Sequence, residues 1–176
     1  MTTVFVIVDV QHKILSVMSE PEKTTNALVQ LTTGMQLLDI PTILLEQYPQ
    51  GLGPTDSAIQ AVIPHIEPIE KTAFSAYEAP AFKSALAQFE DIDRIVLCGI
   101  ESHICLYQTA RDLLDAGYHV EVVADAVDAR TVDNKQIGLD RMAQHGAYIT
   151  STEMILFDLL KHAKHPQFKA ISKLIK

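Results

Sequence analysis

Apolar runs alternate with amphipathic stretches along this chain, and each has the length of a strand or a helix. The first run, residues 4–8, is rich in β-branched residues, which is typical of a strand buried on both faces. Similar short runs predict strands at 42–45, 68–70, 94–98, 119–123 and 147–149. Apolar residues at helical spacing predict helices at 20–39, 56–63, 80–89, 104–116, 132–145 and 150–160, followed by an amphipathic tail from Lys164.

Boundary residues support these elements. Thr150 and Glu153 form the pattern of a capping box at the start of the last helix of the series. Residues 48–55 hold two prolines and two glycines and predict a loop. Strands that alternate with helices predict a mostly parallel six-stranded sheet with helices on both faces. No linker or repeat divides the chain, so we expect a single domain over residues 1–176.

Residues with chemical potential follow the ends of the predicted strands. Asp9, Glu46, Lys71 and the segment 101–105 all do so, and ligand sites in parallel sheets form at that edge. Cys105 lies between a predicted strand and a predicted helix. Free N–H groups and the positive dipole end of a helix start stabilise a thiolate, which is the reactive form of cysteine. The alternative is that Cys105 is a small buried core residue.

Asp9 and Lys71 also permit two interpretations each. Asp9 is either a general base at the mouth of the sheet or a carboxylate that caps the next turn. Lys71 is either a cation that lowers the pKa of the thiol or a surface lysine paired with Glu70. Taken together with Cys105, they would form a nucleophilic unit, in which the carboxylate takes the thiol proton and the thiolate attacks a carbonyl.

Three segments, 6–11, 70–75 and 99–105, resemble the signature segments of isochorismatase-like cysteine hydrolases, and the resemblance runs from Val4 to about Leu160. It implies a three-layer Rossmann-like fold and a catalytic triad of Asp9, Lys71 and Cys105. It also implies an oxyanion hole made by the backbone N–H groups of Glu101 and Cys105, a cis peptide bond between Ile100 and Glu101, and a homo-oligomer.

Metal binding is where the chain departs from part of that family. Nicotinamidases of the family bind a metal through an Asp-x-His pair after the second strand and a further histidine. The corresponding residues here are Glu46, Gln47 and Tyr48, and His65 lies where a third ligand would fall. One carboxylate and one histidine are a poor ligand set for a transition metal, so we expect neither a metal nor another cofactor.

Several further residues are candidates for the substrate pocket. Glu46 and Tyr48 would shape it or hydrogen bond to substrate, although a solvated Glu46 and a packed Tyr48 are equally compatible with the sequence. Phe74 would form an apolar wall or belong to the core. His103 is expected on the substrate side or in solvent rather than as the base of the thiol, because an offset of two residues separates the faces of a helix. Gln11, close to Asp9, completes the set.

Composition restricts the partners and the compartment. The net charge is −8 and no basic patch is present, which disfavours nucleic-acid binding. No apolar stretch is long enough for a membrane span or a signal peptide. The only cysteines are Cys98 and Cys105, so we expect a protein of the reducing cytoplasm without a disulfide framework.

The sequence therefore predicts a cytoplasmic cysteine hydrolase of a small amide or related C–N bond, acting through a thioester on Cys105. Two alternatives stay open: a non-catalytic or regulatory oligomer with the same fold, and a metal-free isochorismatase-type hydrolase.

Overall fold

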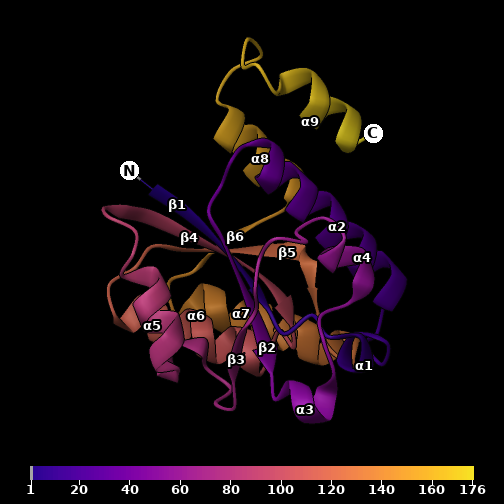
Figure 1. The fold of residues 1–176 in the computed structure, drawn as a ribbon, viewed down its shortest axis with the longest axis vertical. Helices are drawn as coiled ribbons and strands as arrows, with labels where there is room; N and C mark the ends of the chain where they lie inside the picture. Colours follow the sequence, from indigo (N-terminus) through magenta and orange to yellow (C-terminus); the bar gives the residue numbers. More distant parts are fainter. Residues whose placement is uncertain (1) are drawn as a thin grey trace.

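The parallel sheet predicted from the sequence is present in the computed structural model, which describes residues 2–176 (Figure 1). Its strands follow the order β3-β2-β1-β4-β5-β6, and every neighbouring pair is parallel. Their bounds are β1 Thr2–Val8, β2 Thr42–Gln47, β3 Ile69–Lys71, β4 Ile92–Ile100, β5 Val120–Asp128 and β6 Tyr148–Thr150. Strand order reverses between β1 and β4, so the carboxyl ends of these strands flank the crevice where such sheets bind ligands.

Strand β1 shows how the apolar pattern produces three layers. Val4, Val6 and Val8 pack on one side, and Phe5 and Ile7 pack on the other, because successive side chains of a strand point to opposite faces. Helices α5 (Pro80–Leu86), α6 (Cys105–Asp115) and α7 (Val132–Gln144) contribute to the first layer. Helices α2 (Pro21–Leu37), α4 (Ser57–Gln60), α8 (Thr152–Leu160) and α9 (Phe168–Leu174) contribute to the second.

Some predicted boundaries are wrong. Residues 48–55 are not entirely a loop, because Pro49 starts the one-turn helix α3 (Pro49–Leu52). Thr150 is the last residue of β6 rather than a helix cap. The cap of α8 is Ser151, whose side-chain oxygen accepts a hydrogen bond from the N–H of Met154.

The remaining differences are short or extended elements. The turn α1 (His12–Leu15) and the 3₁₀ helix Ala76–Glu78 were not predicted, and both are a single turn long. Helices α4 and α5 end at Gln60 and Leu86 instead of residues 63 and 89. Strands β4 and β5 extend to Ile100 and Asp128; Gly99 in β4 and Asp125 in β5 interrupt the apolar runs from which the strand ends were predicted.

Two glycines allow close approach of the backbone near the carboxyl ends of β1 and β4. Gly99 has φ +117°, and a Cβ atom there would lie 2.1 Å from the carbonyl oxygen of Val8. A Cβ atom on Gly138 of α7 would lie 2.7 Å from the carbonyl oxygen of Ser102. Both contacts require glycine and bring neighbouring elements together at the edge of the sheet where β1 and β4 end.

Within residues 2–176, no helix is both long enough and apolar enough to cross a membrane.

Candidate active site

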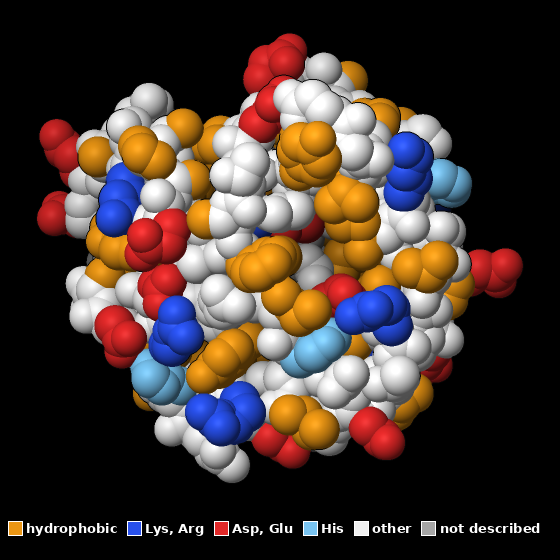
Figure 2. Space-filling model, turned by 90° about the horizontal axis from the view of Figure 1, so that it is seen from below, with side chains coloured by type: hydrophobic (Ala, Val, Ile, Leu, Met, Phe, Trp, Pro, Cys, Tyr) orange, Lys and Arg blue, Asp and Glu red, His pale blue; other side chains and the backbone are white. Residues whose placement is uncertain are grey.

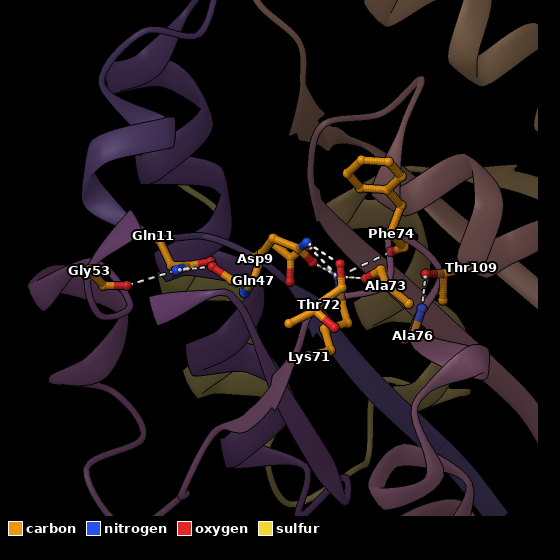
Figure 3. A network of polar contacts seen from close by, with 10 residues as sticks. All are labelled: Asp9, Gln11, Gln47, Gly53, Lys71, Thr72, Ala73, Phe74, Ala76 and Thr109. Atoms are coloured by element: carbon orange, nitrogen blue, oxygen red, sulfur yellow. Dashed lines mark hydrogen bonds and ion pairs between the residues drawn. The ribbon is translucent and has the colours of Figure 1, made fainter. Parts of the chain in front are cut away.

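Asp9 and Lys71 form a buried ion pair at the carboxyl edge of the sheet (Figure 3). Asp9 follows β1 in a left-handed conformation with φ 53°, and Lys71 ends β3. The Lys71 Nζ atom lies 2.7 Å from Asp9 Oδ2, and both side chains are almost fully buried. Because β2 lies between β1 and β3, Lys71 must reach past the end of β2 to make this pair.

The ammonium group of Lys71 is surrounded by acceptors. Besides Asp9, it donates to Gln47 Oε1 at 2.6 Å and to the carbonyl oxygens of Ala73 at 3.2 Å and Phe74 at 3.1 Å. Four acceptors share the three N–H bonds of a protonated lysine. Only one of the four is ionised, so the cation is fixed beside Asp9 without being neutralised by a second carboxylate.

Gln47 was not among the candidates from the sequence, although it fixes Lys71. Its Nε2 donates to the carbonyl of Thr72 at 2.8 Å, which orients Oε1 toward the lysine. The side chain of Gln11 accepts from the Gln47 N–H at 2.7 Å and donates to the Gln47 carbonyl at 2.9 Å and to that of Gly53 at 2.7 Å. Gln11 thus acts through Gln47. A polar residue at the end of a buried strand was the signal available for Gln47.

Cys105 is the first residue of α6 and is 8% exposed. In the preceding turn, the N–H groups of Ile104 and Leu106 both donate to the carbonyl of Glu101, and that of Ser102 donates to Asp128. The backbone N–H groups of Glu101 and Cys105 have no acceptor among residues 2–176. The peptide bond between Ile100 and Glu101 is cis.

The thiol of Cys105 is not ionised at rest. Burial raises its pKa to about 12, the negative charge of Asp9 raises it as well, and the opposing effect of Lys71 is smaller. Lys71 lowers the pKa of the thiol as predicted, but burial and Asp9 outweigh it, so the predicted net lowering of this pKa is wrong. Burial also raises the pKa of Asp9, against the opposing effect of Lys71. Asp9 Oδ1 is buried and has no hydrogen-bond partner in the described part of the chain, so it remains able to accept a proton.

A cavity of about 380 Å³ opens onto Asp9 and the thiol of Cys105, whereas Lys71 lies outside its wall. Figure 2 views the molecule from below Figure 1, where α1 and α3 lie, and this face is hollowed near its centre with hydrophobic side chains around the hollow. The cavity is lined by Asp9, Lys13, Ile14, Val17, Gln47, Leu52, Phe74, Ile100, Glu101, Ile104, Cys105 and Arg130. Its size is that of a small-molecule site.

Comparison with known proteins agrees with this geometry. Residues 3–154 match the isochorismatase domain. The chain belongs to the isochorismatase family. It is 37% identical over 173 residues to isochorismatase domain-containing protein 2 of Danio rerio, which covers 98% of this chain and 86% of that protein. This isochorismatase domain has the hydrolase fold of its family.

Two solved structures extend the comparison. The MAR1 ribonuclease from Caenorhabditis elegans superposes with a TM-score of 0.90 at 34% identity, covering 99% of this chain and 89% of that one. The YcaC gene product of Escherichia coli, an octameric hydrolase of unknown specificity, gives a TM-score of 0.92 at 22% identity, covering 99% and 86%. The second likeness is one of fold.

The predicted pocket residues of this isochorismatase domain lie in different places. Phe74 lines the cavity, whereas Gln11, Glu46, Tyr48 and His103 are outside its wall. Glu46 is buried, and its Oε1 accepts from the N–H and the hydroxyl of Thr55. Tyr48 is 53% exposed and lines a different hollow, beside α3.

His103 and His65, the two histidines considered from the sequence, do not line the cavity. His103 is half-buried, and its Nδ1 has no partner among the described residues. His65 is exposed between α4 and β3, while Glu46 is directed to Thr55. Within residues 2–176, no three His, Cys, Asp or Glu side chains gather as a metal site.

Asp128 holds a wall of the cavity in place. Its carboxylate accepts hydrogen bonds from the hydroxyls of Ser19 and Thr24 and from the N–H groups of Glu20 and Ala129, at 2.6–2.9 Å. These bonds tie the segment after Val17 to the end of β5. Burial alone would raise the pKa of Asp128, but the four hydrogen bonds outweigh it and lower the pKa.

Asp128→Asn is expected to lower the free energy of unfolding by about 3 kcal/mol, because two donors would face an NH₂ group and charged hydrogen bonds are lost. With the folded-state pKa lowered, the contribution of Asp128 is complete above about pH 4 and is lost as pH falls toward the lowered value. Urea unfolding at pH 7 and at pH 3 measures both effects, with exposed Asp140→Asn as the control. An equal loss of stability at the two pH values would contradict the assignment.

Proposed function

We propose that this isochorismatase domain is a cysteine-dependent hydrolase of a small amide or related C–N bond, with Asp9, Lys71 and Cys105 as its catalytic triad. The observation that supports this most is the buried Asp9–Lys71 pair, because its carboxylate lines a substrate-sized cavity together with the thiol of Cys105. A buried charge pair costs desolvation energy. Such pairs are frequent at functional sites, and this one lies next to a candidate nucleophile, which supports a catalytic role.

The raised pKa of the thiol is compatible with the following order of proton transfers. The thiol is neutral at rest, so its proton passes to Asp9 as sulfur bonds to the substrate carbonyl carbon. The electron pair of the C=O bond moves to the oxygen, which would accept from the free N–H groups of Glu101 and Cys105. When the tetrahedral intermediate collapses, the C–N bond breaks and Asp9 gives its proton to the leaving amine.

Water completes the cycle. It gives a proton to Asp9 and its oxygen bonds to the thioester carbon, the C–S bond then breaks, and sulfur regains a proton from Asp9. Throughout, the cation of Lys71 stabilises negative charge as it moves between the carboxylate and the sulfur. The products are a carboxylic acid and an amine or ammonia.

The activity of this triad should depend on pH through Asp9. Because burial raises its pKa, the acid limb of kcat/KM should lie above about pH 4, the ordinary range of an aspartate. Glu46 contributes to that raised pKa by its negative charge. Glu46→Gln should therefore move the acid limb to lower pH, while exposed Glu153→Gln should leave it in place. A limb that does not move in Glu46→Gln would argue that another group sets it.

A release assay tests the proposal directly. A panel of small amides and ureido compounds should yield ammonia with the native protein and not with Cys105→Ala. Failure of every compound, with a folded protein, would favour the alternative of a non-catalytic oligomer. RNA cleavage, the activity named for the nematode relative, is not favoured by a chain of net charge −8, because RNA binding requires clustered cations.

A homo-oligomer also remains a prediction for this chain. The E. coli relative is an octamer, and the edge of the sheet formed by β6 and α8 exposes apolar side chains, namely Tyr148, Ile149, Met154 and Phe157. Sedimentation equilibrium measures the assembly state.

A further inference from the structure

Two cations stand at the wall of the cavity, on either side of the nucleophile. Lys13 follows β1 in the turn α1, and Arg130 follows β5. Cys105 follows β4, which lies between β1 and β5 in the sheet. The triad proposed above uses neither cation, so their presence calls for a separate explanation.

Arg130 pairs with Glu101 and leaves part of its hydrogen-bonding capacity unused. Its Nε and its backbone N–H both donate to Oε2 of Glu101 at 3.1 Å. The two terminal guanidinium nitrogens have no acceptor among residues 2–176. A guanidinium held at Nε presents its outer nitrogens as a planar fork, a geometry that suits the two oxygens of a carboxylate.

Lys13 is a cation of the wall that no carboxylate of the described residues pairs with. Its ammonium donates to the carbonyl of Gly51 at 3.1 Å and forms no ion pair in the described part of the chain. Asp9 is paired with Lys71 and Glu101 with Arg130, so the charge of Lys13 is not neutralised locally. A local positive charge on a protein of net charge −8 is a feature that can select a negatively charged substrate.

Apolar side chains make up most of the remaining wall. They are Ile14, Val17, Leu52, Phe74, Ile100 and Ile104. A substrate that fits this wall is apolar along its length, and polar at the end that meets the triad and at the end that meets the cations.

We propose that the preferred substrate is the monoamide of a short dicarboxylic acid. The amide carbon would lie at Cys105, a short methylene chain along the apolar wall, and the free carboxylate against Arg130, with Lys13 adding long-range attraction. This inference rests on the proposed amide hydrolysis and adds the identity of the far end of the substrate.

Matched substrate pairs test it. Succinamate and butanamide, or glutaramate and pentanamide, differ only in a terminal carboxylate or methyl group. The native protein should favour the anionic member of each pair by about tenfold or more in kcat/KM, the effect of one charged hydrogen bond. Added salt should reduce the preference through the contribution of Lys13.

Variants locate the preference. Arg130→Gln should lower the anionic-to-neutral ratio by about tenfold or more, and Arg130→Lys should recover only part of it because an ammonium lacks the fork. Lys13→Gln should lower the ratio less, and it keeps the test informative if the Arg130 variants do not fold. Arg141→Gln, on α7 and away from the cavity, is the matched control and should leave the ratio unchanged.

Binding separates failure of this inference from failure of the proposed function. Calorimetry with Cys105→Ala should show glutaramate binding that Arg130→Gln weakens in the same background. Such binding without hydrolysis of any amide would support carboxylate recognition and refute the amidase. Hydrolysis of both members of each pair at equal efficiency would overturn the carboxylate site and leave the amidase standing. Neither binding nor hydrolysis would overturn both.

Discussion

Cys105→Ala and Asp9→Asn are each expected to reduce turnover by roughly 10⁴-fold, the scale on which members of a catalytic unit act. The alanine removes the nucleophile. The asparagine keeps the shape of Asp9 but cannot accept the thiol proton. Because the pKa of Cys105 is raised, the proposed mechanism needs such a proton acceptor at neutral pH. The double variant should be little worse than the more severe single variant, because each residue depends on the other.

The measurement is initial rate on the best amide of the panel, with circular dichroism and thermal unfolding to show that each variant is folded. Cys98→Ala is the matched control, since Cys98 is a free, fully buried thiol in β4, and turnover should persist in it. Near-normal turnover by a folded Asp9→Asn variant would exclude Asp9 as the base. Effects that multiply in the double variant would mean that the two residues act independently.

Lys71→Met should be the most destabilising single change in the site, lowering the free energy of unfolding by about 3–5 kcal/mol. The methionine fills the volume of the stem but leaves Asp9 buried without a counter-ion, and leaves Gln47 Oε1 without its donor. Asp9→Asn should cost less, because Lys71 then retains Gln47 and the carbonyls of Ala73 and Phe74.

Two tests follow from this electrostatic explanation. Adding Asp9→Asn to Lys71→Met should restore part of the lost stability, although activity stays absent. The deficit of Lys71→Met should also shrink as pH falls, because burial raises the pKa of Asp9 and the removal of Lys71 raises it further, so that the folded state gains a proton on acidification. Urea unfolding at pH 5 and pH 8 measures both. A double variant no more stable than Lys71→Met would show that lost packing, not the unpaired charge, dominates.

The apolar pattern was sufficient for the sheet and for placing Asp9, Lys71 and Cys105 at its edge, because strand ends in a parallel sheet meet on one side. It could not identify Gln47, since the role of this residue depends on hydrogen bonds to Gln11, Lys71 and Thr72 that come from separate parts of the chain. Arg130 was missed for the same reason: its contact with Glu101 joins the ends of β4 and β5.

The protonation state of the thiol was beyond local reasoning. The start of α6 favours a thiolate, but burial and the charge of Asp9 oppose it, and both arise only when the chain is folded. The orientation of the Glu46 side chain could not be predicted from the sequence either. Its hydrogen-bond partner, Thr55, lies in the irregular segment after α3.

The contact between Gly99 and Val8 has a consequence for how the triad is spaced. Asp9 comes directly after Val8, and Cys105 follows Gly99 after the short segment 100–104, so the separation of the proposed base and nucleophile depends on the distance between the backbones of β1 and β4. A methyl group at residue 99 would meet the Val8 carbonyl and force β1 and β4 apart. The absence of a side chain at residue 99 thus sets how closely the proposed base and nucleophile approach, and a substitution at this chemically inert residue would move apart the two groups between which the proposed mechanism transfers a proton.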